Sequence, residues 1–250
     1  MQAIGITFFL QQYPLLYFRW ILFIHHALPK LKSIKMSDHS PYHPTVLKQE
    51  IANSISHGFG ILFGIVFIPF LLALTAKSGN ITATVGVSIY AFSFLMVYTS
   101  STLYHGFQQP FVKNVLQILD HISIYFLIAG SYTPFILLFL FNSAGITLLC
   151  ILWGLALAGT VFKIFFINKF NFLSTIIYLL MGWMLLVVGK TFFVSVPPNI
   201  LMFIVIGGIL YSLGVVFYLW NKFVYHHLVW HLFVLAASIC HFVAVILAVS

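Results

Sequence analysis

The stretch VYHHLVWHLFVLAASICHFVAVILA, residues 224–248, contains no Asp, Glu, Lys or Arg. At 1.5 Å per residue, a helix of this length is long enough to cross the roughly 30 Å hydrocarbon core of a bilayer. Near its start stand His227 and His231, four residues apart, which a helix places on one face. The stretch therefore predicts a transmembrane helix that presents two imidazoles together near one end.

The composition of the whole chain points to the same environment. Of its 250 residues, 62% are hydrophobic and 6% are charged, whereas soluble domains carry about a quarter charged residues. The formal net charge of +8 does not indicate nucleic-acid binding, because the basic residues are scattered singly at the ends of apolar runs. We therefore expect a multi-pass protein of the cell (cytoplasmic) membrane, surrounded by the lipid bilayer and without a nucleic-acid partner.

Seven apolar segments, each long enough to cross a bilayer, follow one another from Glu50 onward. They cover residues 50–76, 82–106, 115–141, 144–166, 171–189, 200–221 and 224–248. The loops between them are short, which favours antiparallel neighbours in one bundle. The sequence therefore predicts an all-α fold, a seven-transmembrane-helix bundle, in a single membrane domain at residues 48–250.

Residues 1–47 are assigned to an N-terminal tail or interfacial segment. Residues 1–28 are apolar and aromatic, but polar residues such as Gln11 and Arg19 interrupt them, and they lack the features of a signal peptide. Two interpretations stay open for this part: it lies in the membrane interface, or the chain starts at Met36.

The lysines define the expected orientation of the bundle. With the Glu50 end of the first segment inside, most basic residues fall on the inner side, where the positive-inside rule places them. The inner side then holds Lys30, Lys32, Lys35, Lys48, Lys113, Lys163, Lys169 and Lys222, and the outer loops hold Lys77 and Lys190. The prediction is amino terminus in, carboxyl terminus out.

In this topology, four segments bring ionisable side chains to one membrane depth at the inner face. The second segment ends with Ser101 and His105, four residues apart and so on one helical face. The third opens with Asp120, the seventh opens with its histidine pair, and the first adds a stripe at i, i+3 and i+7. In chain order these residues are Glu50, Asn53, His57, Ser101, His105, Asp120, His227 and His231.

Two interpretations compete for these residues. Polar groups inside a span are costly and mark functional sites. Alternatively, the histidines hydrogen-bond between helices, and Glu50 and Asp120 are favourable charges at helix starts. Three histidines with an aspartate nearby favour a metal site, since imidazole is the commonest metal ligand in proteins.

Three further histidines are placed outside this group. His121 and His226 each stand next to one of its members in the sequence and so point about 100° away around the helix, which predicts an interfacial position for both. His241 lies ten residues, about 15 Å, beyond His231. We expect it to pack or to hydrogen-bond.

Taken together, these patterns resemble a known family. Three motifs resemble, in the same order along the chain, those of the hemolysin III branch of the progestin and adipoQ receptor (PAQR) family. They are Glu50-x-x-Asn53-x-x-x-His57, Ser101-x-x-x-His105 followed by Asp120, and His227-x-x-x-His231. The run from Asp120 to Phe135 also resembles bacterial members. The likeness covers roughly residue 48 to the carboxyl terminus.

The resemblance implies a zinc ion held by His105, His227 and His231 near the cytoplasmic face, with Asp120 on the metal-bound water and Ser101 close by. It also implies membership of a wider superfamily of intramembrane metal-dependent hydrolases that includes alkaline ceramidases. A membrane lipid would then be the substrate or ligand. The name hemolysin III records an association with red-cell lysis.

Our leading interpretation is a zinc-dependent hydrolase of a lipid amide or ester, similar to a ceramidase. Three neutral histidines leave a fourth position on zinc open to water, as in catalytic sites. Asp120 would act as general base, and Ser101 would hydrogen-bond the water or the oxyanion. Glu50, Asn53 and His57 would orient the ligands and anchor their helix.

Other functions stay open beside this one. A lipid sensor or receptor with a structural zinc is one, although the sequence has no soluble signalling domain that would favour it. A membrane-lytic hemolysin is another, against which stands the lack of an amphipathic inserting segment. A proton transporter is less consistent with the sequence, because the ionisable groups gather at one face instead of forming a relay.

Overall fold

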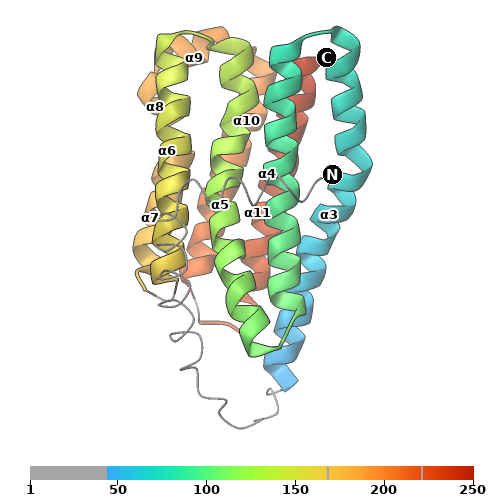
Figure 1. Ribbon diagram of the computed structural model, residues 1–250, viewed down its shortest axis with the longest axis vertical. Coiled ribbons are helices and arrows are strands. Elements are labelled where there is room, and N and C mark those ends of the chain that lie inside the picture. The colour runs from blue at the N-terminus through green and yellow to red at the C-terminus, as the bar shows by residue number, and fades with distance from the viewer. Residues whose placement is uncertain (1–43, 168, 221) are drawn as a thin grey trace, which may run out of the picture. The chain divides into compact units, whose positions relative to one another are not determined.

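The structure, a computed structural model, describes residues 44–167, 169–220 and 222–250, and these consist of helices and short connections. Figure 1 shows the long helices side by side, with successive ones running in opposite directions. The tail predicted for residues 1–47, with the alternative start at Met36, lies outside the described residues as far as residue 43. The helices are α3 (Pro44–Ser78), α4 (Ile81–Gly106), α5 (Pro110–Phe139), α6 (Ser143–Phe166), α7 (Asn171–Gly182), α8 (Leu185–Val188), α9 (Lys190–Ser195), α10 (Pro198–Leu219) and α11 (His226–Val249).

Six helices in the described ranges have the length and apolar composition of membrane spans, namely α3, α4, α5, α6, α10 and α11. One face of α3 shows the expected lipid contact surface, because Phe59, Leu62 and Val66 lie at i, i+3 and i+7 and are 60%, 60% and 64% exposed. A helix of a soluble protein would bury such a stripe. The prediction of an all-α, multi-pass membrane protein is confirmed.

The fifth predicted segment, residues 171–189, is not one continuous helix. It forms α7 and α8 and ends at Gly189, directly before α9, and these three helices follow one another along the same side of the bundle in Figure 1. α7 has only 12 residues, about 18 Å at 1.5 Å per residue, so it is too short to cross the hydrocarbon core alone. The prediction of continuous spanning helices is therefore correct for six segments and wrong for this one.

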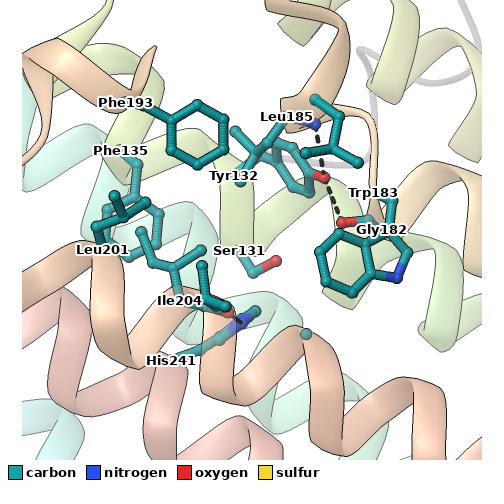
Figure 2. Close-up of a pocket in the computed structure, with 13 residues that line it drawn as sticks. Ser131, Tyr132, Phe135, Gly182, Trp183, Leu185, Phe193, Leu201, Ile204 and His241 are labelled. Carbon is teal, nitrogen blue, oxygen red and sulfur yellow. Dashed lines mark hydrogen bonds between the residues drawn. The ribbon is translucent and has the colours of Figure 1, made fainter. Parts of the chain in front are cut away.

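A tyrosine from α5 satisfies the backbone at this interruption. The hydroxyl of Tyr132 donates to the carbonyl of Gly182 at 2.6 Å and accepts from the backbone N–H of Leu185 at 3.3 Å (Figure 2). Backbone polar groups freed inside a membrane must find such partners. Gly189, between α8 and α9, adopts φ 57°, a left-handed conformation that favours glycine.

Recognisable sequence signals start the long helices. The side-chain amides of Asn80 and Asn142 cap α4 and α6, each accepting a backbone N–H at 3.0 Å. Pro110 and Pro198 occupy the first turn of α5 and α10, where a missing N–H costs nothing. Because α5 begins at Pro110, it starts before the segment that hydropathy predicts at 115–141.

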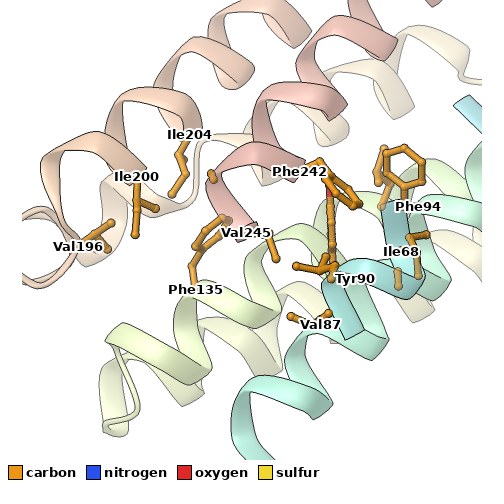
Figure 3. Packing of buried hydrophobic residues seen from close by; sticks show 14 of the residues in the cluster. Ile68, Val87, Tyr90, Phe94, Phe135, Val196, Ile200, Ile204, Phe242 and Val245 are labelled. Atoms are coloured by element: carbon orange, nitrogen blue, oxygen red, sulfur yellow. The ribbon is translucent and has the colours of Figure 1, made fainter. Parts of the chain in front are cut away.

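The apolar core fills the half of the bundle in which α3 and α11 end. Figure 3 shows Phe94 of α4 and Phe242 of α11 there, with ring centroids 5.9 Å apart, beside Tyr90 and Val245. α3 packs against both α4 and α11. This core fixes the spacing of the three helices whose other halves carry the predicted site.

Candidate metal centre

Three histidines meet where α4 ends and α11 begins. His105 is the last residue but one of α4, and His227 and His231 lie in the first two turns of α11. The ring centroid of His105 is 5.2 Å from that of His227 and 5.0 Å from that of His231, and the latter two are 4.6 Å apart. One ligating nitrogen from each lies within 4.8 Å of the others. His105 and His231 are buried and His227 is half-buried, so this histidine trio fits a metal ion.

Glu50 of α3 sets the orientation of His105. Its Oε2 atom accepts a hydrogen bond from Nδ1 of His105 at 2.9 Å. Nε2 of the same ring is buried and has no hydrogen-bond partner among the described residues. A carboxylate behind a ligand histidine fixes the tautomer and the ring orientation. The lone pair of Nε2 is therefore the one that His105 presents to the trio.

α3 also supports His231 from behind. Nδ1 of His231 donates to the backbone carbonyl of Asn53 at 3.3 Å and lies 3.2 Å from Oγ of Ser56. The ring of His57 stacks on that of His231, with centroids 3.7 Å apart and planes inclined by 20°. With Nδ1 engaged in this way, Nε2 is again the nitrogen that is available to a ligand.

Neither Glu50 nor Asp120 lies in the first turn of its helix, because α3 begins at Pro44 and α5 at Pro110. The helix macrodipole acts on charges within the first turn. The interpretation of these acids as favourable charges at helix starts is therefore wrong for both. Each is a half-buried carboxylate within a helix that has the composition of a membrane span.

A cavity of about 590 Å³ lies against the histidine trio, with walls from α3, α4, α5, α7, α10 and α11. Asp120 and Ser101, the predicted base and hydrogen-bond donor, both line it. All the residues of the predicted site share this one cavity: Glu50, Asn53, His57, Ser101, His105, Asp120, His227 and His231.

A hydrogen bond between α4 and α5 fixes the height of Asp120. Oγ of Ser100 donates to Oγ of Ser123 at 3.0 Å, which brings these two positions level. The helices are antiparallel, so Asp120, three residues before Ser123, lies within about one turn of Ser101 and His105 along the bundle axis. The carboxylate is thus at the depth that the topology predicts.

Several buried polar atoms beside the trio lack a hydrogen-bond partner within the described residues. They are Oδ1 of Asn53, both ring nitrogens of His57, Oγ of Ser101 and Nε2 of His105. Buried polar groups in proteins are nearly always paired, and exceptions often mark the place of a ligand, an ion or a water molecule. Their position on one cavity wall fits a site that is completed by a metal ion and a polar ligand.

Three features of the cavity region depart from the sequence analysis. His121 and His226, expected away from the site, both line the cavity, because a wide cavity exposes more than one stripe of a helix. Lys163, expected among the inner loop cations, is fully buried and donates to Oδ1 of Asn171 at 3.3 Å. Lys113 is also expected only as a loop cation, but its ammonium group contacts Glu50 at 2.7 Å.

A smaller pocket of about 40 Å³ shares Ser131, Trp183 and His241 with the main cavity (Figure 2). Here Nε2 of His241 donates to the carbonyl of Ile204 at 3.2 Å. The prediction that His241 hydrogen-bonds outside the trio is confirmed. The cavity therefore reaches from the trio to a residue about 15 Å further along α11.

Comparison with known proteins shows the family to which the chain belongs. The family described as Haemolysin-III related matches residues 45–242. The chain belongs to this family. A hemolysin-3 homolog of Bacillus subtilis (strain 168) is 45% identical over 200 residues, which cover 80% of this chain and 94% of that one. Hemolysin-3 of Bacillus cereus is 42% identical over 200 residues, covering 80% and 91%.

Animal proteins are also similar to this chain. Human monocyte to macrophage differentiation factor is 27% identical over 212 residues, covering 82% of this chain and 85% of that protein. The predicted resemblance to the hemolysin III branch of the PAQR family is confirmed. The range matched by the haemolysin-III family contains every residue of the predicted site, from Glu50 to His231.

Proposed function

We propose that this haemolysin-III family protein is a zinc-dependent intramembrane hydrolase of a lipid amide or ester. The observation that carries the proposal is the convergence of His105, His227 and His231 on a cavity that Asp120 and Ser101 also line. Catalytic zinc sites use three protein ligands and keep a fourth position for water or substrate, whereas structural sites are closed by four. A trio of imidazoles beside a carboxylate and a hydroxyl matches the catalytic type.

Zinc is the proposed ion because neutral imidazole nitrogens are among its preferred ligands. His105 and His231 would bind it through Nε2, since Nδ1 of each ring is engaged by an oxygen atom of α3. Bound there, zinc would polarise a substrate carbonyl and lower the pKa of a coordinated water.

The chain's own residues supply the remaining functions of a hydrolysis. The carboxylate of Asp120 is proposed to accept a proton from water and to return it to the leaving group. Oγ of Ser101 is buried, has no hydrogen-bond partner within the described residues and lines the same cavity as Asp120, so it is proposed to donate to the developing oxyanion. Glu50, Asn53 and His57 are proposed to hold the ligand rings in place.

A lipid is the proposed substrate because of where the cavity lies. Most of its walls are helices with the composition of membrane spans. Its lining includes Trp230 beside the histidine trio, and Leu127 and Val234 between the trio and His241. Apolar and aromatic walls suit an alkyl chain, and the few polar groups at the trio suit its amide or ester group.

We further propose that the chain crosses the cytoplasmic membrane seven times, with the amino terminus inside and α7 to α9 as the fifth crossing. The support is the lysine distribution. Lys163 is buried and does not count as a loop charge. Of the other described lysines, the end of the bundle with the trio carries Lys48, Lys113, Lys169 and Lys222, and the opposite end carries Lys77 and Lys190.

Membrane lysis is the second candidate function, because two relatives are named hemolysin-3 or its homolog. Lysis and hydrolysis differ in whether the activity requires the histidine trio. A pore or a lytic surface acts without turnover of lipid, and its activity does not depend on a metal ligand set in the cavity wall.

The test combines metal content with turnover in the detergent-purified protein. Zinc is measured by elemental analysis, and hydrolysis is followed with a fluorescent ceramide and a fluorescent acyl ester. His105→Ala, His227→Ala and His231→Ala should each lower bound zinc strongly, because two ligands are too few. His241→Ala is the matched control: it removes a cavity-lining histidine outside the trio and should keep its zinc.

Three outcomes count against the proposal. Full zinc occupancy in the double variant His227→Ala/His231→Ala would exclude the trio as the metal site. Stoichiometric zinc without turnover of either lipid would favour a sensor with a structural metal. Dye release from lipid vesicles that is equal for wild type and the histidine variants would favour the lytic function.

A further inference from the structure

The Oε2 atom of Glu50 accepts hydrogen bonds from two sides. His105 donates through Nδ1 at 2.9 Å, and Lys113 donates through Nζ at 2.7 Å. The three side chains come from α3, α4 and α5, and each is at most 16% exposed. One carboxylate oxygen of Glu50 thus links the ammonium group of Lys113 to Nδ1 of His105, a candidate metal ligand.

Lys113 reaches this position because the connection before it is short. α4 ends at Gly106 and α5 begins at Pro110, so the first turn of α5 returns to the end of α4. The ammonium group also donates to the carbonyl of Tyr104 at 3.1 Å and to Oε1 of Gln108 at 3.4 Å. It lies 4.7 Å from the centroid of the Tyr104 ring.

These contacts hold the backbone of His105 as well as its ring. The carbonyl of Tyr104 belongs to the last turn of α4, where carbonyl groups lack helical partners and a cation is favourable. Gln108, which accepts from Lys113, itself donates to the carbonyl of His105 at 2.7 Å. Lys113 therefore contacts Glu50, which holds the ring of His105, and also Tyr104 and Gln108, which adjoin or bind the backbone of His105.

We propose that Lys113 is a positioning residue of the metal centre, which acts by holding Glu50 on Nδ1 of His105. The inference rests on the proposed metal site and adds to it a residue outside the motifs of the sequence analysis. A charge-assisted bond of 2.7 Å is among the strong ones in proteins. Without it, the Glu50 carboxylate loses one of the two donors that it has among the described residues and is free to rotate away from His105.

The lysine charge is the feature that the role requires. Hydrogen-bonding partners of metal ligands typically contribute about 10- to 100-fold in metal affinity. Lys113→Met should therefore weaken zinc binding by about this factor, and Lys113→Arg, which keeps a cation near Glu50, should recover most of the loss. Lys48→Met removes the same charge from an exposed position on α3 and is the matched control.

A double-mutant cycle separates positioning from general stability. Zinc affinity is measured by chelator competition for wild type, Lys113→Met, Glu50→Gln and the double variant, and metal-free thermal unfolding is recorded for each. If Lys113 acts through Glu50, adding Lys113→Met to Glu50→Gln should cause little further loss of affinity. If Lys113→Met does not fold, Lys113→Gln, which keeps a donor for the Tyr104 carbonyl, replaces it in the cycle.

The outcomes distinguish this inference from the proposed function. A wild-type protein that binds no zinc overturns both. Wild-type zinc binding with equally tight binding by Lys113→Met overturns the role of Lys113 alone. That role is also overturned if the full loss persists in the Glu50→Gln background, because Lys113 then acts independently of Glu50.

Discussion

Individual residues of the site divide into oriented ligands and unpaired neighbours. Nδ1 of His105 and of His231 is held by oxygen atoms of α3, so both rings are oriented before any ion arrives. Asn53, His57 and Ser101 carry buried nitrogen or oxygen atoms that have no hydrogen-bond partner among the described residues. Each such atom costs about 1–3 kcal/mol if it stays unpaired. The binding of an ion and a polar ligand would recover this cost, which argues that the wall is built for binding.

Asp120→Asn tests the proposed base at this scale. The change keeps the size of the side chain and removes its ability to accept a proton. Turnover of the lipid amide or ester should fall by about 10²- to 10⁴-fold, as expected for a lost general base. Zinc content, measured on the same preparation, should stay close to that of wild type, because the trio is intact.

Two results would contradict this assignment. Loss of zinc in Asp120→Asn as complete as in the histidine variants would make Asp120 a ligand and close the open metal position. Wild-type turnover with zinc retained would mean that another group accepts the proton.

Helix packing sets the spacing of the site, and Gly60 of α3 shows how closely. A Cβ atom at Gly60 would collide with the ring of Tyr98 on α4. That ring also lies edge-on to His57, with centroids 5.1 Å apart. Gly60→Ala should therefore destabilise the protein by about 1–3 kcal/mol, the usual effect of overpacking, and should weaken zinc binding through His57. Denaturant unfolding in detergent micelles and chelator competition measure the two effects.

Gly58 provides the control on the same helix, two residues away. A Cβ atom there meets no other atom within 4 Å. Gly58→Ala should not destabilise the protein, since alanine is the better helix former by up to about 1 kcal/mol. Equal losses in both variants would show that the effect comes from glycine replacement in α3 and not from contact with Tyr98.

The elements also show what a single sequence can predict. Apolar length located six helices of spanning length, because composition decides whether a helix can lie in lipid. The same measure could not detect the interruption of residues 171–189. Hydropathy averages over a window, whereas the interruption depends on Tyr132, a residue of another helix that satisfies the freed backbone groups. In the sequence of this segment, only Gly182 and Gly189 indicate an interruption of the helix.

The arrangement of the whole bundle explains why the meeting of the three histidines could be predicted from the sequence. Spacing places His227 and His231 on one face, and alternating crossings bring the end of α4 to the start of α11, so His105 joins them. The contact between Lys113 and Glu50 was not predictable in this way. It depends on side-chain directions across three helices, and the positive-inside rule already gave Lys113 another explanation.

Orientation in the membrane is predicted at the scale of the whole molecule. The lysine bias predicts that the end of the bundle with the trio faces the cytoplasm and that the carboxyl terminus faces outward. A reporter active only in the cytoplasm, fused after Ser250 in a bacterial host, should therefore be silent. The same reporter fused after Lys169, between α6 and α7, should be active, because that connection lies at the trio end. The opposite pair of results would place the trio on the outer face, and its substrate would then come from the outer leaflet.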